Sequence, residues 1–91
     1  EKILASVSRA YSVPVDQMKS KKRTDSIANA RHVAVYLIKQ LTELTLKEIG
    51  AIFGRDYSTG ISSIDKVEKS IKTVNNYETE INRLLKEIKG Q

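Results

Sequence analysis

Apolar residues recur at helical spacing along most of the chain. Stripes with a period of three to four residues predict helices over residues 2–11, 26–44, 46–53, 57–73 and 77–89. A short helical turn, PVDQM, is expected after Pro14, because the residue before a proline avoids helical geometry. The pattern therefore predicts an all-α fold, a compact bundle of about five to six helices.

Polar signals mark the ends of these helices. The segment 19–25, KSKKRTD, has no apolar residue and is expected to be a solvated loop, with Ser26 as the N-cap of the long helix that follows. Thr45–Glu48 fits a capping box, in which the threonine and the glutamate each accept a backbone N–H of the other. Gly54 fits a helix stop, where a positive φ costs a glycine little.

The segment 45–59, TLKEIGAIFGRDYST, has the form of two short helices joined by a glycine turn, with Asp56 or Ser58 capping the second. This is the form of a helix-turn-helix, whose second helix enters the major groove of DNA. Helical angles place an apolar side of the second helix inward: Ile61, Ile64, Val67, Glu68 and Ile71. The opposite, outward side carries hydroxyls and a lysine: Thr59, Ser62, Ser63, Lys66 and Ser70. Hydroxyl groups can bond to base edges or phosphates, so this side is the predicted reading surface.

Composition narrows the class of protein. Ninety-one residues predict one domain, 1–91, and a net charge of +5 with a pI near 9.6 favours a polyanionic partner, most often nucleic acid. The excess charge is concentrated in residues 19–39, which hold six basic residues and one acid. The chain has no cysteine and one histidine, so we expect no metal or other cofactor and no catalytic role. The absence of cysteine and of a long apolar run also predicts a cytoplasmic protein without a membrane segment.

Each candidate residue has a structural reading beside the functional one. The run Lys21, Lys22 and Arg23 is either a solvated surface or a loop that enters the minor groove. Arg31, His32 and Lys39 are either an exposed helix face or contacts to phosphates and base edges. Thr45 needs no role beyond capping, although a helix start also suits a phosphate. Tyr57 either buries against Phe53 or contacts DNA, and Ser58 and Thr59 favour DNA contact over capping alone.

Over nearly its whole length the chain resembles the C-terminal DNA-binding domain of DnaA, the bacterial chromosomal replication initiator family. The most specific stretch is Ile49–Gly50, Phe53–Gly54 and then Arg55–Thr59. The segments Ser20–Arg23, Ala30–Ala34 and Leu41–Thr42 match the family's order and spacing. The resemblance implies a Trp-repressor-like helix-turn-helix domain that binds the DnaA box, a short A·T-rich element repeated at replication origins.

The resemblance also implies residue roles. Arg23 matches the arginine that reads the minor groove, and Arg31 matches a helix arginine that approaches DNA. Lys39, Leu46 and Lys47 match positions at backbone phosphates. The family reads base edges with an Asp-His-Thr-Thr run, which corresponds here to Asp56, Tyr57, Ser58 and Thr59. The chain departs from the family at Tyr57, at Gly60, which replaces a valine, and in a turn that is one residue shorter.

The main prediction is sequence-preferring binding of double-stranded DNA by a monomeric domain, with an ATPase module possible upstream in the full-length protein. The predicted contact residues are Lys21, Lys22, Arg23, Arg31, His32, Lys39, Thr45, Leu46, Lys47, Asp56, Tyr57, Ser58, Thr59, Ser62 and Lys66. Two alternatives stay open. One is the DNA-binding domain of a transposase-associated protein, and the other is a helical protein-interaction module that docks through residues 77–89.

Overall fold

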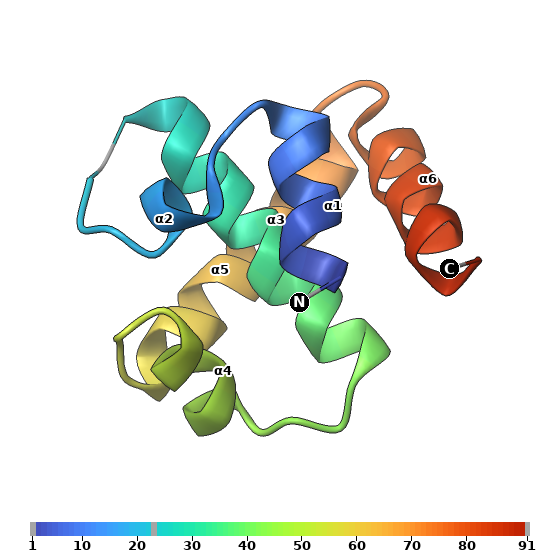
Figure 1. Ribbon diagram of the computed structural model, residues 1–91. Coiled ribbons are helices and arrows are strands. Elements are labelled where there is room, and N and C mark those ends of the chain that lie inside the picture. Colours follow the sequence, from blue (N-terminus) through green and yellow to red (C-terminus); the bar gives the residue numbers. More distant parts are fainter. Residues whose placement is uncertain (1, 23, 91) are drawn as a thin grey trace.

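Six helices make up the part of the chain that the computed structural model describes, residues 2–22 and 24–90 (Figure 1). They are α1 (Lys2–Tyr11), α2 (Val15–Met18), α3 (Asp25–Leu41), α4 (Leu46–Ile52), α5 (Tyr57–Thr73) and α6 (Tyr77–Lys89). The described residues contain no strand, so the all-α expectation is confirmed. Arg23, the predicted minor-groove residue, lies outside the described residues.

The long helix α3 lies at the centre and contacts α1, α2, α4 and α5 (Figure 1). Helix α6 packs on α1 and α5, on the other side of the molecule from α4. The core is almost entirely aliphatic, as the low aromatic content requires: Ile3, Leu4, Val7, Val13, Met18, Ala30, Val33, Ala34, Val35, Leu37, Ile38, Ile49, Phe53, Val67, Ile81 and Leu84. Helix α3 contributes the most members because neighbours cover it on several sides.

Most predicted helix limits are confirmed, and two limits of the long helix are wrong. Helix α3 begins at Asp25, and its N-cap is Thr24 rather than Ser26. It ends at Leu41 rather than Leu44, because Thr42 leaves helical geometry. The Thr42 hydroxyl then donates to the carbonyl of Ile38 at 2.7 Å and satisfies an acceptor of the last turn.

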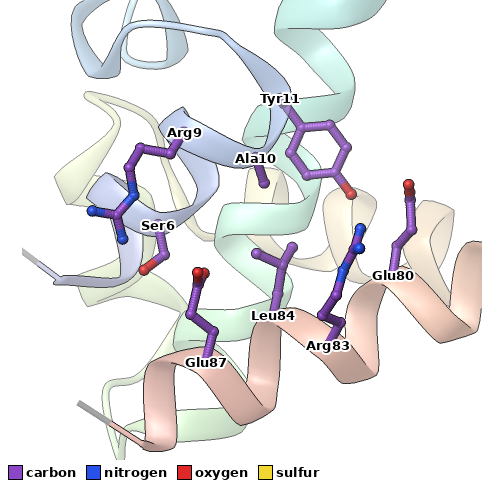
Figure 2. Close-up of a pocket in the computed structure, with 8 residues that line it drawn as sticks. All are labelled: Ser6, Arg9, Ala10, Tyr11, Glu80, Arg83, Leu84 and Glu87. Atoms are coloured by element: carbon purple, nitrogen blue, oxygen red, sulfur yellow. The ribbon is translucent and has the colours of Figure 1, made fainter.

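A small pocket separates α1 from α6, and the ring of Tyr11 reaches over it from α1 (Figure 2). Figure 2 shows the Tyr11 hydroxyl pointing toward α6, beside the side chains of Glu80 and Arg83. The hydroxyl oxygen is buried and has no hydrogen-bond partner among the described residues. Burial, followed by the charge of Glu80, raises the pKa of Tyr11 to about 12. The interface therefore favours the neutral phenol.

Replacing Tyr11 with phenylalanine is expected to raise the free energy of unfolding by about 1 kcal/mol at pH 7, because a buried hydroxyl without a partner is removed. The variant should also resist alkali. The folded pKa of Tyr11 exceeds the usual value of 10.0, so the titration of Tyr11 leaves the stability of the wild-type chain unchanged below pH 10 and lowers it as the pH rises to 12. The phenylalanine variant has no such group to titrate. Urea unfolding at pH 7 and at pH 11.5 measures both effects. Tyr57→Phe removes an exposed hydroxyl and is the control, and equal behaviour of the two variants would contradict the argument.

Candidate nucleic-acid interface

The predicted capping box at the start of α4 is present. The Thr45 hydroxyl accepts the backbone N–H of Glu48 at 3.1 Å, and the Glu48 carboxylate accepts the backbone N–H of Thr45 at 2.8 Å. The bond from the Thr45 backbone lowers the pKa of Glu48. The capping box thus closes the first turn of α4 with local hydrogen bonds, and Thr45 keeps its own hydroxyl hydrogen for a further acceptor.

The turn between α4 and α5 depends on two glycines in different ways. Gly54 has φ +66°, the left-handed conformation expected of it. Gly50 lies under the turn, and the backbone N–H of Arg55 donates to its carbonyl at 2.8 Å. A Cβ atom on Gly50 would meet the carbonyl oxygen of Asp56 and would lie 2.8 Å from that of Arg55. The close approach at Gly50 is therefore to the turn backbone.

Asp56 is the N-cap of α5, which decides between the two predicted caps. Its carboxylate accepts the backbone N–H of Ser58 at 3.0 Å and also the Ser58 hydroxyl. The hydroxyl bond, followed by the backbone bond, lowers the pKa of Asp56. The Ser58 oxygen, held with its hydrogen toward Asp56, faces solvent as a hydrogen-bond acceptor.

Helix α5 is rotated relative to the sequence expectation. Gly60, Ser63 and Val67 face the interior, whereas Ile61, expected inward, is 51% exposed. Ser63, expected outward, is fully buried. The physical reason is the close approach of neighbouring helices: a Cβ on Gly60 would lie 2.9 Å from a methyl carbon of Leu46 in α4. Small residues therefore occupy the inward side of α5 near its start.

Buried Ser63 pairs with His32 of α3, whose Nδ1 lies 2.8 Å from the serine hydroxyl. His32 is half-buried, and burial lowers its pKa, followed by the positive charges of Lys66, Arg31 and Arg55. His32 is therefore a neutral hydrogen-bonding residue at pH 7. It ties α3 to α5 and adds no positive charge to the surface.

Arg31 is 4% exposed, so the exposed helix face considered for it is wrong. Its guanidinium donates from Nε to the carbonyl of Met18 at 2.7 Å, and from Nη2 to the carbonyls of Ser20 and Lys22 at 2.9 and 3.0 Å. These acceptors belong to the end of α2 and the basic loop that follows it. Arg31 stays a predicted DNA residue, but its position is that of a support beneath the loop.

The same loop is joined to the helix-turn-helix. The guanidinium of Arg55, in the turn before α5, donates to the carbonyl of Ser20 at 3.1 Å, so Ser20 accepts from both arginines. Lys21 lines a small pocket with Gly54 and Arg55. The basic loop and the start of α5 therefore lie side by side, on the left in Figure 1. Arg55 is not among the predicted contact residues, although its place between Gly54 and Asp56 marks it as a turn residue.

A hollow of about 510 Å³ opens between α3 and the first half of α5. Its lining is rich in hydroxyl and cationic groups: Asp25, Ala28, Arg31, His32, Arg55, Ser58, Thr59, Ser62, Ser63 and Lys66. Ser58, Ser62 and Lys66 are exposed on its rim, and Thr59 is half-buried. The structure thus brings four predicted residues of α5 together with His32 and Arg31 around one concave surface: Ser58, Thr59, Ser62 and Lys66.

The remaining predicted residues that the structure describes do not line this hollow. Lys21, Lys22, Lys39, Thr45 and Lys47 are exposed. Lys39 lies seven residues beyond His32 on α3, about 10 Å farther along the helix axis. Leu46 is half-buried and packs beneath Gly60. Tyr57 is 58% exposed, so the alternative that it buries against Phe53 is wrong.

Residues 2–22 and 24–90 contain no group of three or more His, Cys, Asp or Glu side chains that could hold a metal ion. None of the helices described by the structure has the length and apolar character needed to cross a membrane.

The chain is similar in sequence to known proteins. The family described as "Bacterial dnaA protein helix-turn-helix" matches residues 1–67. The chromosomal replication initiator protein DnaA of Caldanaerobacter subterraneus subsp. tengcongensis is 38% identical over 84 residues, which cover 92% of this chain and 19% of that protein. The protein of the same name from Thermodesulfovibrio yellowstonii is 39% identical over 92 residues, which cover 100% and 21%. The chain thus spans about a fifth of the length of these relatives.

Proposed function

We propose that this chain, which belongs to the family of bacterial DnaA helix-turn-helix domains, binds double-stranded DNA with a preference for particular sequences. One observation carries the proposal: the hydroxyl-bearing end of α5 and the basic loop lie on the same side of the molecule and are joined through the Ser20 carbonyl. A single duplex can therefore meet both elements, one in each of two adjacent grooves.

In this arrangement α5 enters the major groove with its N-terminal end first. Ser58 and Thr59 reach base edges, and Ser58 offers an oxygen to the amino groups of adenine or cytosine. The Asp56 carboxylate already accepts the backbone N–H and the hydroxyl of Ser58, and it thereby fixes the direction of the Ser58 side chain. It can accept from a base only while it also keeps these capping bonds. Tyr57 lies beside them on the exposed side of the helix.

Exposed cations flank this reading end and supply phosphate contacts, which position the protein without reading sequence. The proposed contacts are Lys21, Lys22, Lys39, Lys47 and Lys66, with the Thr45 hydroxyl and the start of α4 at Leu46 beside them. Arg23 is proposed for the minor groove on the strength of the family match alone. Arg31 lies beneath the loop and His32 lines the hollow. We propose that both act indirectly, by holding the contacting elements in place.

The two relatives are named chromosomal replication initiators. We extend this name to the present chain as a proposal: it recognises DnaA boxes at a replication origin, as a monomeric domain attached to an ATPase module in a cytoplasmic protein. In a selection of DNA duplexes, the transposase-associated alternative would enrich a different sequence, and the protein-interaction alternative would enrich none.

Selection of duplexes from a random pool by the 91-residue chain tests the proposal. Enrichment of an A·T-rich element related to the DnaA box is expected. Enrichment of hairpins or unrelated sites would support the transposase-associated alternative, and no enrichment would contradict DNA binding. On the selected duplex, the five lysine contacts to phosphate should give a slope of log K against log salt of about −4.5. A slope close to zero would contradict the cationic interface.

The double substitution Ser58→Ala and Thr59→Ala is expected to reduce the preference for the selected duplex over a scrambled one by about tenfold or more, because each lost base-edge contact costs about 1–3 kcal/mol. Binding to the scrambled duplex should change little, since the phosphate contacts remain. Fluorescence anisotropy with both duplexes measures the ratio. Ser8→Ala together with Thr79→Ala, on α1 and α6, is the matched control, and an unchanged preference in the α5 variant would remove these hydroxyls from the reading surface.

A further inference from the structure

Large apolar side chains are rarely exposed in the part of the chain that the structure describes. The three examples are Tyr57, Ile61 and Val74, with Val74 just beyond the end of α5. The other two lie four residues apart, on the first two turns of α5, and therefore stand next to each other on one stripe of the helix. This pair occupies the helix end that the proposed function places in the major groove.

The packing of α5 fixes the direction of the pair. Gly60 faces Leu46 of α4, and Ser63 bonds His32 of α3, so the rotation of the helix is set from two sides. At 100° per residue, Tyr57 and Ile61 then lie on the outward side next to the Ser58 and Ser62 stripe. The exposed start of α5 thus carries an apolar stripe beside a hydroxyl stripe.

The major groove offers one chemical group to an apolar side chain, the C5-methyl group of thymine, whereas its other groups are hydrogen-bond donors and acceptors. The geometry points to recognition of thymine methyl groups by Tyr57 and Ile61, next to the bases met by Ser58. This inference rests on the proposed function and deepens it. It assigns to Ile61 a part in sequence preference, and it gives Tyr57 an apolar role instead of a hydrogen-bonding one.

Replacement of single thymines by uracil tests the inference, because uracil removes the methyl group and keeps every hydrogen-bonding atom. On the duplex selected by the wild-type chain, uracil at one or two positions is expected to weaken binding about fourfold per methyl group, the factor that corresponds to about 0.8 kcal/mol. The Ile61→Ala and Tyr57→Ala variants should bind the thymine duplex more weakly and lose this difference at one of those positions. The salt slope should be unchanged, since no phosphate contact is touched.

Val74→Ala is the matched control, because it shortens the third exposed apolar side chain away from the start of α5 and should keep the full response to uracil. Thermal unfolding of each variant checks that the fold is kept. Selection of a duplex without any response to uracil would overturn this inference and leave the proposed function standing. The same response to uracil in the wild-type, Ile61→Ala and Tyr57→Ala chains would also overturn it. Failure to select any duplex would overturn both the inference and the proposed function.

Discussion

Substituting Gly50 with alanine is expected to lower the free energy of unfolding by about 3 kcal/mol, the largest effect of any single methyl group added to this chain. The new Cβ would press on the backbone carbonyls of Asp56 and Arg55, and backbone cannot rotate away as a side chain can. The turn before α5 would have to open. Urea unfolding measures the loss, and binding to the selected duplex should weaken with it because α5 and the basic loop would separate.

The other two glycines of the motif are the controls. Gly54 has open space around it, so Gly54→Ala should cost only the strain of a positive φ, about 1 kcal/mol. Gly60→Ala meets the end of the Leu46 side chain, which can move, and it gains the higher helix propensity of alanine, so a change within about 1 kcal/mol is expected. Equal losses at Gly50 and Gly60 would show that the turn backbone is not the obstacle.

Replacing Arg31 with alanine is expected to cost about 3 kcal/mol of stability and also to weaken DNA binding. The substitution removes three hydrogen bonds from the guanidinium. The carbonyls of Met18 and Lys22 lose this donor, and the carbonyl of Ser20 keeps only the guanidinium of Arg55. The stability of Arg31→Lys should lie between that of the wild-type chain and that of Arg31→Ala, because a single ammonium group cannot reproduce the planar fork of donors. Chemical unfolding and duplex binding are measured on the same samples.

Lys39→Ala is the matched control, since it removes an exposed cation from the same helix and should change stability by less than about 0.5 kcal/mol. Its effect should appear in DNA binding and in the salt slope alone. If Arg31→Ala instead resembled Lys39→Ala, with full stability and a weaker salt slope, Arg31 would be a direct phosphate contact and the supporting role would be wrong.

Local signals made most of the architecture predictable. Thr45, Gly54 and Asp56 each mark a helix end through their own backbone neighbours, and such signals can be read without knowing what packs on the helix. The family signature around the turn supplied the function class. The wrong N-terminal limit of α3 falls at a weak cap, because Thr24 makes no side-chain capping bond.

The rotation of α5 and the position of Arg31 could not be predicted in the same way. An apolar stripe is expected to face inward, but here the inward side is set by how closely α3 and α4 approach, which favours Gly60 and Ser63 over Ile61. The acceptors of Arg31 are backbone carbonyls, which every residue carries and which therefore leave no mark in the sequence. Tertiary packing, and not local preference, decides both features.

The shared Ser20 carbonyl fixes the basic loop relative to the turn before α5, because Arg31 of α3 and Arg55 of that turn both donate to it. The distance between the two elements proposed to contact DNA is therefore fixed. Each base pair of B-form DNA advances about 3.4 Å along the axis and turns by about 34°. In the proposed complex, one extra base pair between the positions contacted in the two grooves would move the second position out of reach. Every DNA sequence that binds must therefore keep the same spacing between these positions.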